Sequence, residues 1–383
     1  MNRARRIVHF VAGSAIAFGG ALPGAGFAEA AVLPMISQSD VSELTRLARG
    51  FLADRTEALV THGAGGKFEP TLLQHETAGE LRFAENLRRQ VLAARRGVLD
   101  RAGERYAASR VGVVLSNVRL DGQSARADAL ESTVLDYARV APDDPEFTAF
   151  EVRHEFTFAR EANGRRWVVV DERAVEPESI LSINQVGSDP DRELAGLHSM
   201  FIEAEPAPDA RRTARKQQAT PLSFAYLNYD AIAAYAEKYW SNYNPNYRRF
   251  DGGAGGDCTN FISQALSWGG WAHVLGGHTS LNAWWYDKWA TQTYTWVGAH
   301  QWSSFATQSG RVYRLINPGD MGKGDILQMD FDRDGKMDHS MVVSYVSSRY
   351  LPYLTYHTAS TFRRTLTSIR ASYPNAILYA WRT

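Results

Sequence analysis

The chain has a single cysteine, Cys258, among 383 residues. A disulfide needs two cysteines, so no disulfide can form within this chain. Basic and acidic side chains balance at 42 each, which gives no electrostatic reason to expect a nucleic acid or an anionic lipid as partner. Long apolar runs are also missing after the first 30 residues, so we expect no later segment to span a bilayer.

The first 30 residues have the composition of an export signal. Three arginines precede an apolar stretch that begins at Ile7, and Ala28-Glu29-Ala30 fits a small-x-small cleavage site. The stretch is shorter than the ~20 residues that a membrane helix needs. We therefore expect cleavage after Ala30 and a secreted protein outside the membrane, with an uncleaved anchor as the alternative.

Changes in composition along the chain predict two domains. Nine of the ten tryptophans lie from Trp240 onward, whereas Glu237 is the only glutamate after residue 220. A stretch rich in proline and charge separates these regions and is typical of a solvated linker. The expected organisation is an accessory domain at 40–185, a linker at 186–222 and a catalytic domain at 223–383.

The accessory domain is expected to be a small α+β unit. Helix-spaced apolar residues predict helices at 42–59 and 79–105, and alternating apolar residues predict four strands between 111 and 171. Helices followed by an antiparallel meander are similar to cystatin-like or nuclear-transport-factor-like folds. No metal-ligand spacing occurs among its histidines, so we expect binding, spacing or inhibition here rather than chemistry. These histidines are His62, His75 and His154.

Cys258 is predicted to begin a helix. Glycines and Asp257 precede it, the apolar spacing from Thr259 to Trp268 is helical, and glycines follow. The field at a helix amino end is worth ~0.3–1 kcal/mol, less than the ~1.4 kcal/mol of one pKa unit. An activated thiol therefore needs a second partner, and we expect an ion pair with a histidine. The alternative is a small buried apolar residue.

Two histidines of the catalytic domain, His339 and His357, fall on predicted strands. If the hairpin that carries them folds symmetrically about Ser348, the two imidazoles face each other with Cβ atoms ~5 Å apart. A slip of one residue would send His357 to the other face of the sheet. One histidine would act as base and the other would orient it, whereas the alternative for each is a hydrogen-bonded core histidine.

Four segments together resemble the family named "putative amidase domain", which is similar to NlpC-type and CHAP cell-wall peptidases of papain-like fold. The segments are Gly255–Leu266, Gly324–Gln328, Asp338–Ser340 and Tyr356–Thr358. The resemblance covers about residues 225–383 and implies an α+β fold in which a helix-borne cysteine packs on an antiparallel sheet.

The resemblance also implies roles for single residues. Cys258 would be the nucleophile, His339 the base and His357 the orienting residue. NlpC-type enzymes place a tyrosine upstream of the cysteine to help bind the oxyanion, and Tyr247 is the nearest counterpart here. The backbone N–H of Cys258 is a second candidate donor.

The function implied is a secreted cysteine amidohydrolase or peptidase that forms a thioester and requires no cofactor. Its substrate would be a peptide amide, with peptidoglycan stem peptides as the first expectation, and the protein is expected to be a monomer. Two alternatives stay open. One is an inactive papain-fold binding or adhesion module, and the other is an acyltransferase that uses the same nucleophile.

An acidic run just before His339 matches the first nine positions of a calcium-binding loop. The expected ligands are the carboxylates of Asp330, Asp332, Asp334 and Asp338 and the backbone carbonyl of Lys336. The position of the usual bidentate glutamate is occupied by a methionine. The sequence thus leaves two alternatives, a structural calcium ion or an acidic turn without an ion.

Overall fold

The computed structural model describes residues 36–61, 76–139, 141–161, 164, 166–177, 179–203, 227–250, 256–288 and 291–383. The predicted export signal, His62, His75 and the second half of the predicted linker lie outside these residues. From Ile36 to Thr383 the chain forms one compact unit. Within the described ranges, every helix is too short or too polar to cross a bilayer.

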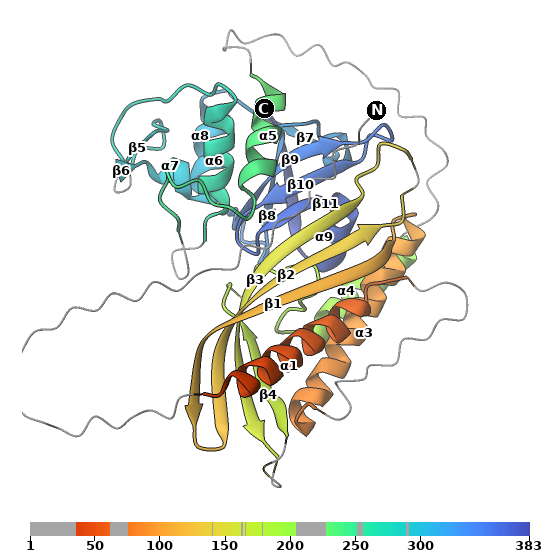
Figure 1. Ribbon diagram of the computed structural model, residues 1–383. Helices are drawn as coiled ribbons and strands as arrows, with labels where there is room; N and C mark the ends of the chain where they lie inside the picture. Colours follow the sequence, from red (N-terminus) through yellow and green to blue (C-terminus); the bar gives the residue numbers. More distant parts are fainter. Residues whose placement is uncertain are drawn as a thin grey trace, which may run out of the picture. The chain divides into compact units, whose positions relative to one another are not determined.

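Two long helices pack on a meander of long strands in the amino-terminal half (Figure 1). The first helix starts at a Ser37 cap, whose hydroxyl accepts a hydrogen bond from the Asp40 amide. Its apolar stripe, including Leu44 and Phe51, is fully buried against the sheet. The elements are α1 (Gln38–Glu57), α3 (Gly79–Arg101), β1 (Tyr106–Asp121), β2 (Ser124–Tyr137), β3 (Phe147–Arg160) and β4 (Trp167–Ala174). These helices and the antiparallel meander confirm the predicted elements, and the tight turn after Asp121 uses the positive φ of Gly122.

The carboxyl-terminal half places helices on both faces of an antiparallel sheet. Its helices are α5 (Tyr229–Tyr239), α6 (Cys258–Trp268), α7 (Tyr294–Val297), α8 (Ala299–Gln308), α9 (Leu366–Ser372) and the short 3-10 turn η1 (Pro318–Asp320). Its strands are β5 (Tyr286–Lys288), β6 (Thr291–Gln292), β7 (Tyr313–Leu315), β8 (Ile326–Asp330), β9 (His339–Val346), β10 (Pro352–Tyr356), β11 (Thr361–Thr365) and β12 (Ile377–Arg382).

Alternation along the central strand β9 separates two cores. Val342 packs with α5, α6 and a group of buried tryptophans, whereas Met341 and Val343 pack with Ile369 of α9. Successive side chains of a strand point to opposite faces, so even-numbered residues of β9 face α6 and odd-numbered ones face α9. This alternation decides below where the candidate histidines lie.

One sheet runs through both halves of the chain. Its strand order is β1-β2-β3-β11-β10-β9-β8-β12-β7, and the junction is the pairing of Thr361 with Phe150 and of Phe362 with Ala149. The predicted α+β class is confirmed. The resemblance of the two parts to cystatin-like and papain-like folds stays a prediction, as do the domain boundaries. In the structure, the two predicted domains share this sheet.

Part of the predicted linker is folded. Residues 190–203 form helix α4 (Pro190–Glu203), which packs on α3. Leu197 is fully buried in an apolar cluster, and Glu193 pairs with the buried guanidinium of Arg95. The expectation of a solvated segment from residue 186 was wrong for this helix, because a charged sequence is stabilised here by a buried partner of opposite charge.

Candidate active site

Cys258 is the first residue of α6, as the sequence predicts. Its side chain is 3% exposed, and α6 packs against β9 and β10. The sulfur lies 3.7 Å from the hydroxyl of Thr259 and accepts a hydrogen bond from the backbone N–H of Ser340. The sulfur of Cys258, on helix α6, is thus close in space to the start of β9.

The thiol of Cys258 is neutral in this conformation. Burial raises its pKa, and the negative charge of Asp257 acts in the same direction, while the hydrogen bonds from Thr259 and Ser340 oppose them without reversing the shift. Among the described residues no hydrogen bond joins the sulfur to an imidazole. The expected ion pair with a histidine is therefore absent from the described part of the structure.

His339 is 1% exposed and begins β9. Its ring packs edge-on against Tyr356 at 5.3 Å between centroids and lies over Phe331, and both of these residues belong to the core on the α9 side. Neither ring nitrogen has a hydrogen-bond partner in the described part of the chain. Burial lowers the pKa of His339 to about 3, assisted by the positive charge of Arg364, so the ring is neutral.

His357 follows β10 and lies on the α6 side of the sheet. Its Nδ1 is 2.6 Å from Oδ2 of Asp257, and its Nε2 is 2.8 Å from the backbone carbonyl oxygen of Tyr239. The ring is stacked between Tyr243 and Phe261, with centroid separations of 3.8 and 3.9 Å. Both edges and both faces of this imidazole are therefore occupied.

The predicted register of the hairpin was wrong by one residue at the histidines. Leu354 pairs with Val343 and Thr355 with Val342, whereas a hairpin symmetric about Ser348 would shift each pairing by one. The register changes at a β-bulge between Tyr353 and Leu354. Because side chains alternate with a period of two, this slip sends His339 and His357 to opposite faces of the sheet.

Tyr247 lies apart from the sulfur in its described contacts. Its ring packs on Tyr286 and stacks over Trp296, and burial raises the pKa of its phenol. These contacts make it part of the apolar core below α6. The backbone N–H of Cys258 at the helix start stays the second candidate for an oxyanion donor.

Asp257 is a residue whose part in the site the sequence analysis did not foresee. One carboxylate oxygen meets His357, and the other accepts hydrogen bonds from the backbone N–H of Phe250 and from the side chain of Asn260. The side chain is 2% exposed. An acidic residue directly before the cysteine was the available signal, since a buried carboxylate needs a partner.

The acidic loop brings three of its four carboxylates together. Ligand oxygens of Asp330, Asp332 and Asp338 lie within 4.8 Å of one another. The carboxylate of Asp334 instead pairs with the ammonium of Lys336 at 2.8 Å. Burial raises the pKa of Asp338, and the negative charges of the neighbouring aspartates raise it further. Three converging carboxylates and this repulsion fit a bound divalent cation, although Asp334 does not join them.

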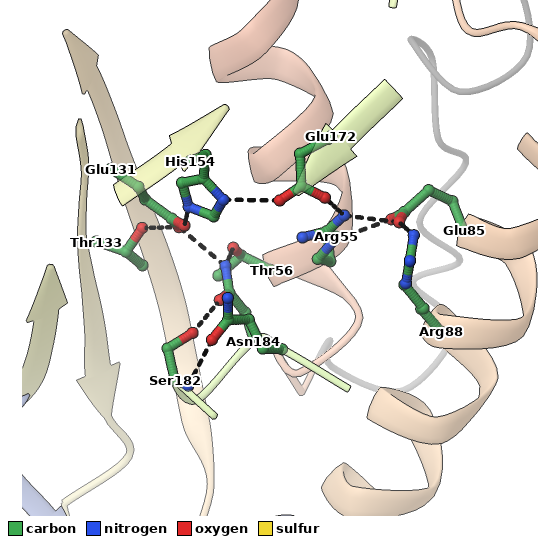
Figure 2. Close-up of polar contacts among 11 residues, drawn as sticks. Arg55, Thr56, Glu85, Arg88, Glu131, Thr133, His154, Glu172, Ser182 and Asn184 are labelled. Carbon is green, nitrogen blue, oxygen red and sulfur yellow. Dashed lines mark hydrogen bonds and ion pairs between the residues drawn. The ribbon is translucent and has the colours of Figure 1, made fainter. Parts of the chain in front are cut away.

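A second buried polar centre lies in the amino-terminal half, where the sequence predicted no chemistry. Six charged side chains form a continuous chain of contacts (Figure 2). In order they are Arg88, Glu85, Arg55, Glu172, His154 and Glu131. Asn184 and Thr133 donate further hydrogen bonds to the carboxylate of Glu131. Spacing along the sequence could not reveal this centre, because its members come from two helices and three strands.

His154 at the middle of this chain is charged. It is fully buried, and its Nδ1 and Nε2 lie 2.7 and 2.9 Å from carboxylate oxygens of Glu172 and Glu131. Burial alone would lower the pKa of His154, but the hydrogen bonds to the two glutamates raise it to about 9. With the imidazolium counted, three positive groups match three negative ones.

Comparison with known proteins finds a likeness in the region around Cys258. Residues 226–381 match the family described as "Putative amidase domain". "Uncharacterized protein YhbB" of Bacillus subtilis (strain 168) is 26% identical over 247 residues, which is 64% of this chain and 74% of that protein. "Uncharacterized protein YjcM" of the same organism is 28% identical over 159 residues, 38% of this chain and 35% of that protein. The YhbB alignment is longer than the amidase segment, so that likeness includes residues before it.

Proposed function

We propose that the segment from residue 226 is a cysteine amidohydrolase with Cys258 as nucleophile. The observation that carries the proposal is the position of the chain's only cysteine, within the matched amidase segment and at the first residue of a helix. Unsatisfied backbone N–H groups at a helix amino end can stabilise the negative oxygen of a tetrahedral intermediate. Papain-like architecture is part of this proposal.

In the proposed reaction the thiol of Cys258 gives its proton to a base while sulfur bonds to the carbonyl carbon. The C–N bond then breaks, the amine leaves with the proton, and water hydrolyses the thioester to a carboxylic acid. His339 is the proposed base. Both of its ring nitrogens lack a hydrogen-bond partner among the described residues, but its side chain lies on the α9 face of the sheet. The proposal therefore requires the backbone at the start of β9 to rearrange so that the ring reaches the sulfur.

A peptide amide is the proposed substrate, and peptidoglycan stem peptides are the first to test. We further propose that the protein is secreted, is a monomer and needs no cofactor for turnover. The loop 330–338 leads directly into His339, so a calcium ion held there by Asp330, Asp332 and Asp338 would fix the start of β9 without entering the reaction.

The decisive experiment compares wild type with Cys258→Ala on purified cell-wall peptides, followed by mass spectrometry. We expect wild type to release a new amine and a new carboxylate, and the variant to lose at least about a thousand-fold in rate. His273→Gln, which changes a histidine outside the site, is the matched control and should keep full activity. Equal product from wild type and Cys258→Ala would contradict the proposal.

A second candidate function, a binding module without turnover, is favoured by the burial and raised pKa of the thiol. Iodoacetamide labelling at several pH values separates the two. An enzyme should show labelling that depends on His339 and slows in His339→Phe. A binding module should label slowly and equally in both proteins, and should retain peptides unchanged.

A further inference from the structure

The turn between β10 and β11, residues 357–360, joins the candidate site to the amino-terminal half. We infer that this turn is a clamp that positions His357 beside the start of α6. The turn is attached at two points: the Thr358 hydroxyl bonds to the residue before α6, and the residues after it pack on strand β3. The inference deepens the proposed function and rests on it for the catalytic readout. It assigns to residues 36–203 a positioning role in the amidase site.

The backbone of the turn is held in an unfavourable conformation. Thr358 and Ala359 have φ values of 62° and 56°, in the left-handed region that residues with a Cβ avoid. A β-branched residue such as threonine is especially rare there. Two such residues in succession persist only where surrounding contacts outweigh the strain.

The first contact of the clamp is with the start of helix α6. The hydroxyl of Thr358 accepts a hydrogen bond of 3.0 Å from the backbone N–H of Asp257, the residue before Cys258. Gly256 allows this approach, because a Cβ at that position would lie 2.4 Å from the same hydroxyl oxygen. The turn therefore packs on the two residues that lead into the helix.

The second contact of the clamp is with strand β3, which lies outside the matched amidase segment. The carbonyl of Ser360 accepts a hydrogen bond of 2.8 Å from the backbone N–H of Glu151. Ala359 is buried in a core cluster with Phe150 and Val152 of β3. The pairing of Thr361 with Phe150 continues this contact into the sheet.

The clamp fixes the orientation of the His357 ring. Both of its nitrogens lie next to acceptors, a carboxylate of Asp257 and the backbone carbonyl of Tyr239. With both nitrogens engaged in this way, the ring is not placed to take a proton from the thiol. Its role is to hold Asp257, the residue that precedes the nucleophile, which makes it a positioning residue.

The test compares three variants of the full chain. Thr358→Val keeps the shape but removes the hydroxyl, and Thr358→Ser keeps the hydroxyl. Thr148→Val removes a matched hydroxyl on the same strand interface. The hydroxyl of Thr148 donates a hydrogen bond of 2.8 Å to the carbonyl of Phe362, which lies outside the turn. On the peptide substrate we expect Thr358→Val to lose about ten- to a hundred-fold in kcat with KM unchanged. Thr358→Ser and Thr148→Val should stay within about three-fold of wild type.

A spectroscopic readout keeps this inference separate from the proposed function. In histidine-labelled protein, the hydrogen-bonded ring N–H signals of His357 should be in slow exchange, and they are assigned by their loss in His357→Gln. These signals should persist in Thr358→Ser and Thr148→Val and vanish or broaden in Thr358→Val. If wild type has no amidase activity but the signals follow this pattern, the proposed function fails and the clamp stands. Signals unchanged in Thr358→Val, or equal loss of kcat in Thr358→Val and Thr148→Val, would overturn the clamp.

Discussion

His154 and His339 are both fully enclosed, yet they differ in charge. Carboxylates of Glu131 and Glu172 meet both nitrogens of His154 and raise its pKa to about 9. Among the described residues, the ring of His339 packs on Phe331 and Tyr356 without a hydrogen bond at either nitrogen, and burial lowers its pKa to about 3. Burial alone opposes the charged form, so the partners decide the sign.

The difference also separates two uses of a buried histidine. A satisfied imidazolium such as His154 links strands β2 and β4 through Glu131 and Glu172, and has no free nitrogen for chemistry. A neutral ring that lacks hydrogen bonds in the described part of the chain, such as His339, costs stability, because its polar atoms are desolvated without compensation. This cost makes His339 the better candidate for a group kept for its reactivity.

The largest effect on stability is expected in the charged chain of the amino-terminal half. Glu172→Gln leaves Arg55 and His154 buried without their shared carboxylate, and should lower the free energy of unfolding by about 3–5 kcal/mol. Glu155→Gln is the control, since its pair with Arg173 is exposed and should matter by less than about 1 kcal/mol. Urea unfolding at pH 7 measures both. Equal effects would mean that the buried chain is no stronger than a surface pair.

The next effect is a loss of stability at alkaline pH. The folded-state pKa of His154 lies near 9 and the ordinary value is 6.5, so its protonation stabilises the fold fully below pH 6.5. This contribution, on the order of 3 kcal/mol, should disappear as pH rises through about 9. Unfolding measured between pH 6 and 10 should show the decline, and His154→Gln should flatten it. An unchanged slope in that variant would contradict the assignment.

An effect of opposite sign, seen on acidification, is expected for His339. Below pH 6.5 the unfolded chain takes up a proton that the folded ring refuses until about pH 3, so stability should fall as pH drops through this window. His339→Phe removes both unsatisfied nitrogens and should flatten this decline. At pH 7 it should leave stability unchanged or raise it by about 1 kcal/mol. A loss of more than about 2 kcal/mol at pH 7 would show that the ring has a stabilising polar partner.

The smallest effect is expected from calcium at the loop before His339. Addition of calcium should raise the melting temperature by a few degrees, because an ion that binds only the folded state stabilises it. Asp332→Asn should abolish the rise, whereas Asp334→Asn should keep most of it, since Asp334 pairs with Lys336. Calorimetry without binding heat, together with an unchanged melting temperature, would favour the ion-free turn.

The sequence predicted local features of the site well. The helix beginning at Cys258, the strand beginning at His339 and the strand ending beside His357 all follow from apolar periodicity and glycine stops. Helix α4 was missed, because its charged residues are stabilised by Arg95 from far along the chain. The register at His357 was missed because a bulge adds a residue that hydrophobic alternation does not reveal.

By itself, the sequence determined that no disulfide forms within the chain, the order of the long helices and strands of the amino-terminal half, and the position of the lone thiol at a helix start. These depend on composition and on neighbours a few residues apart. The tertiary structure decided which histidine faces which side of the sheet, that Asp257 rather than His339 meets His357, and that strand β3 supports the turn beside the cysteine helix. The first relation depends on a bulge in one hairpin, and the other two join residues a hundred or more positions apart. Only packing and strand register decide such relations.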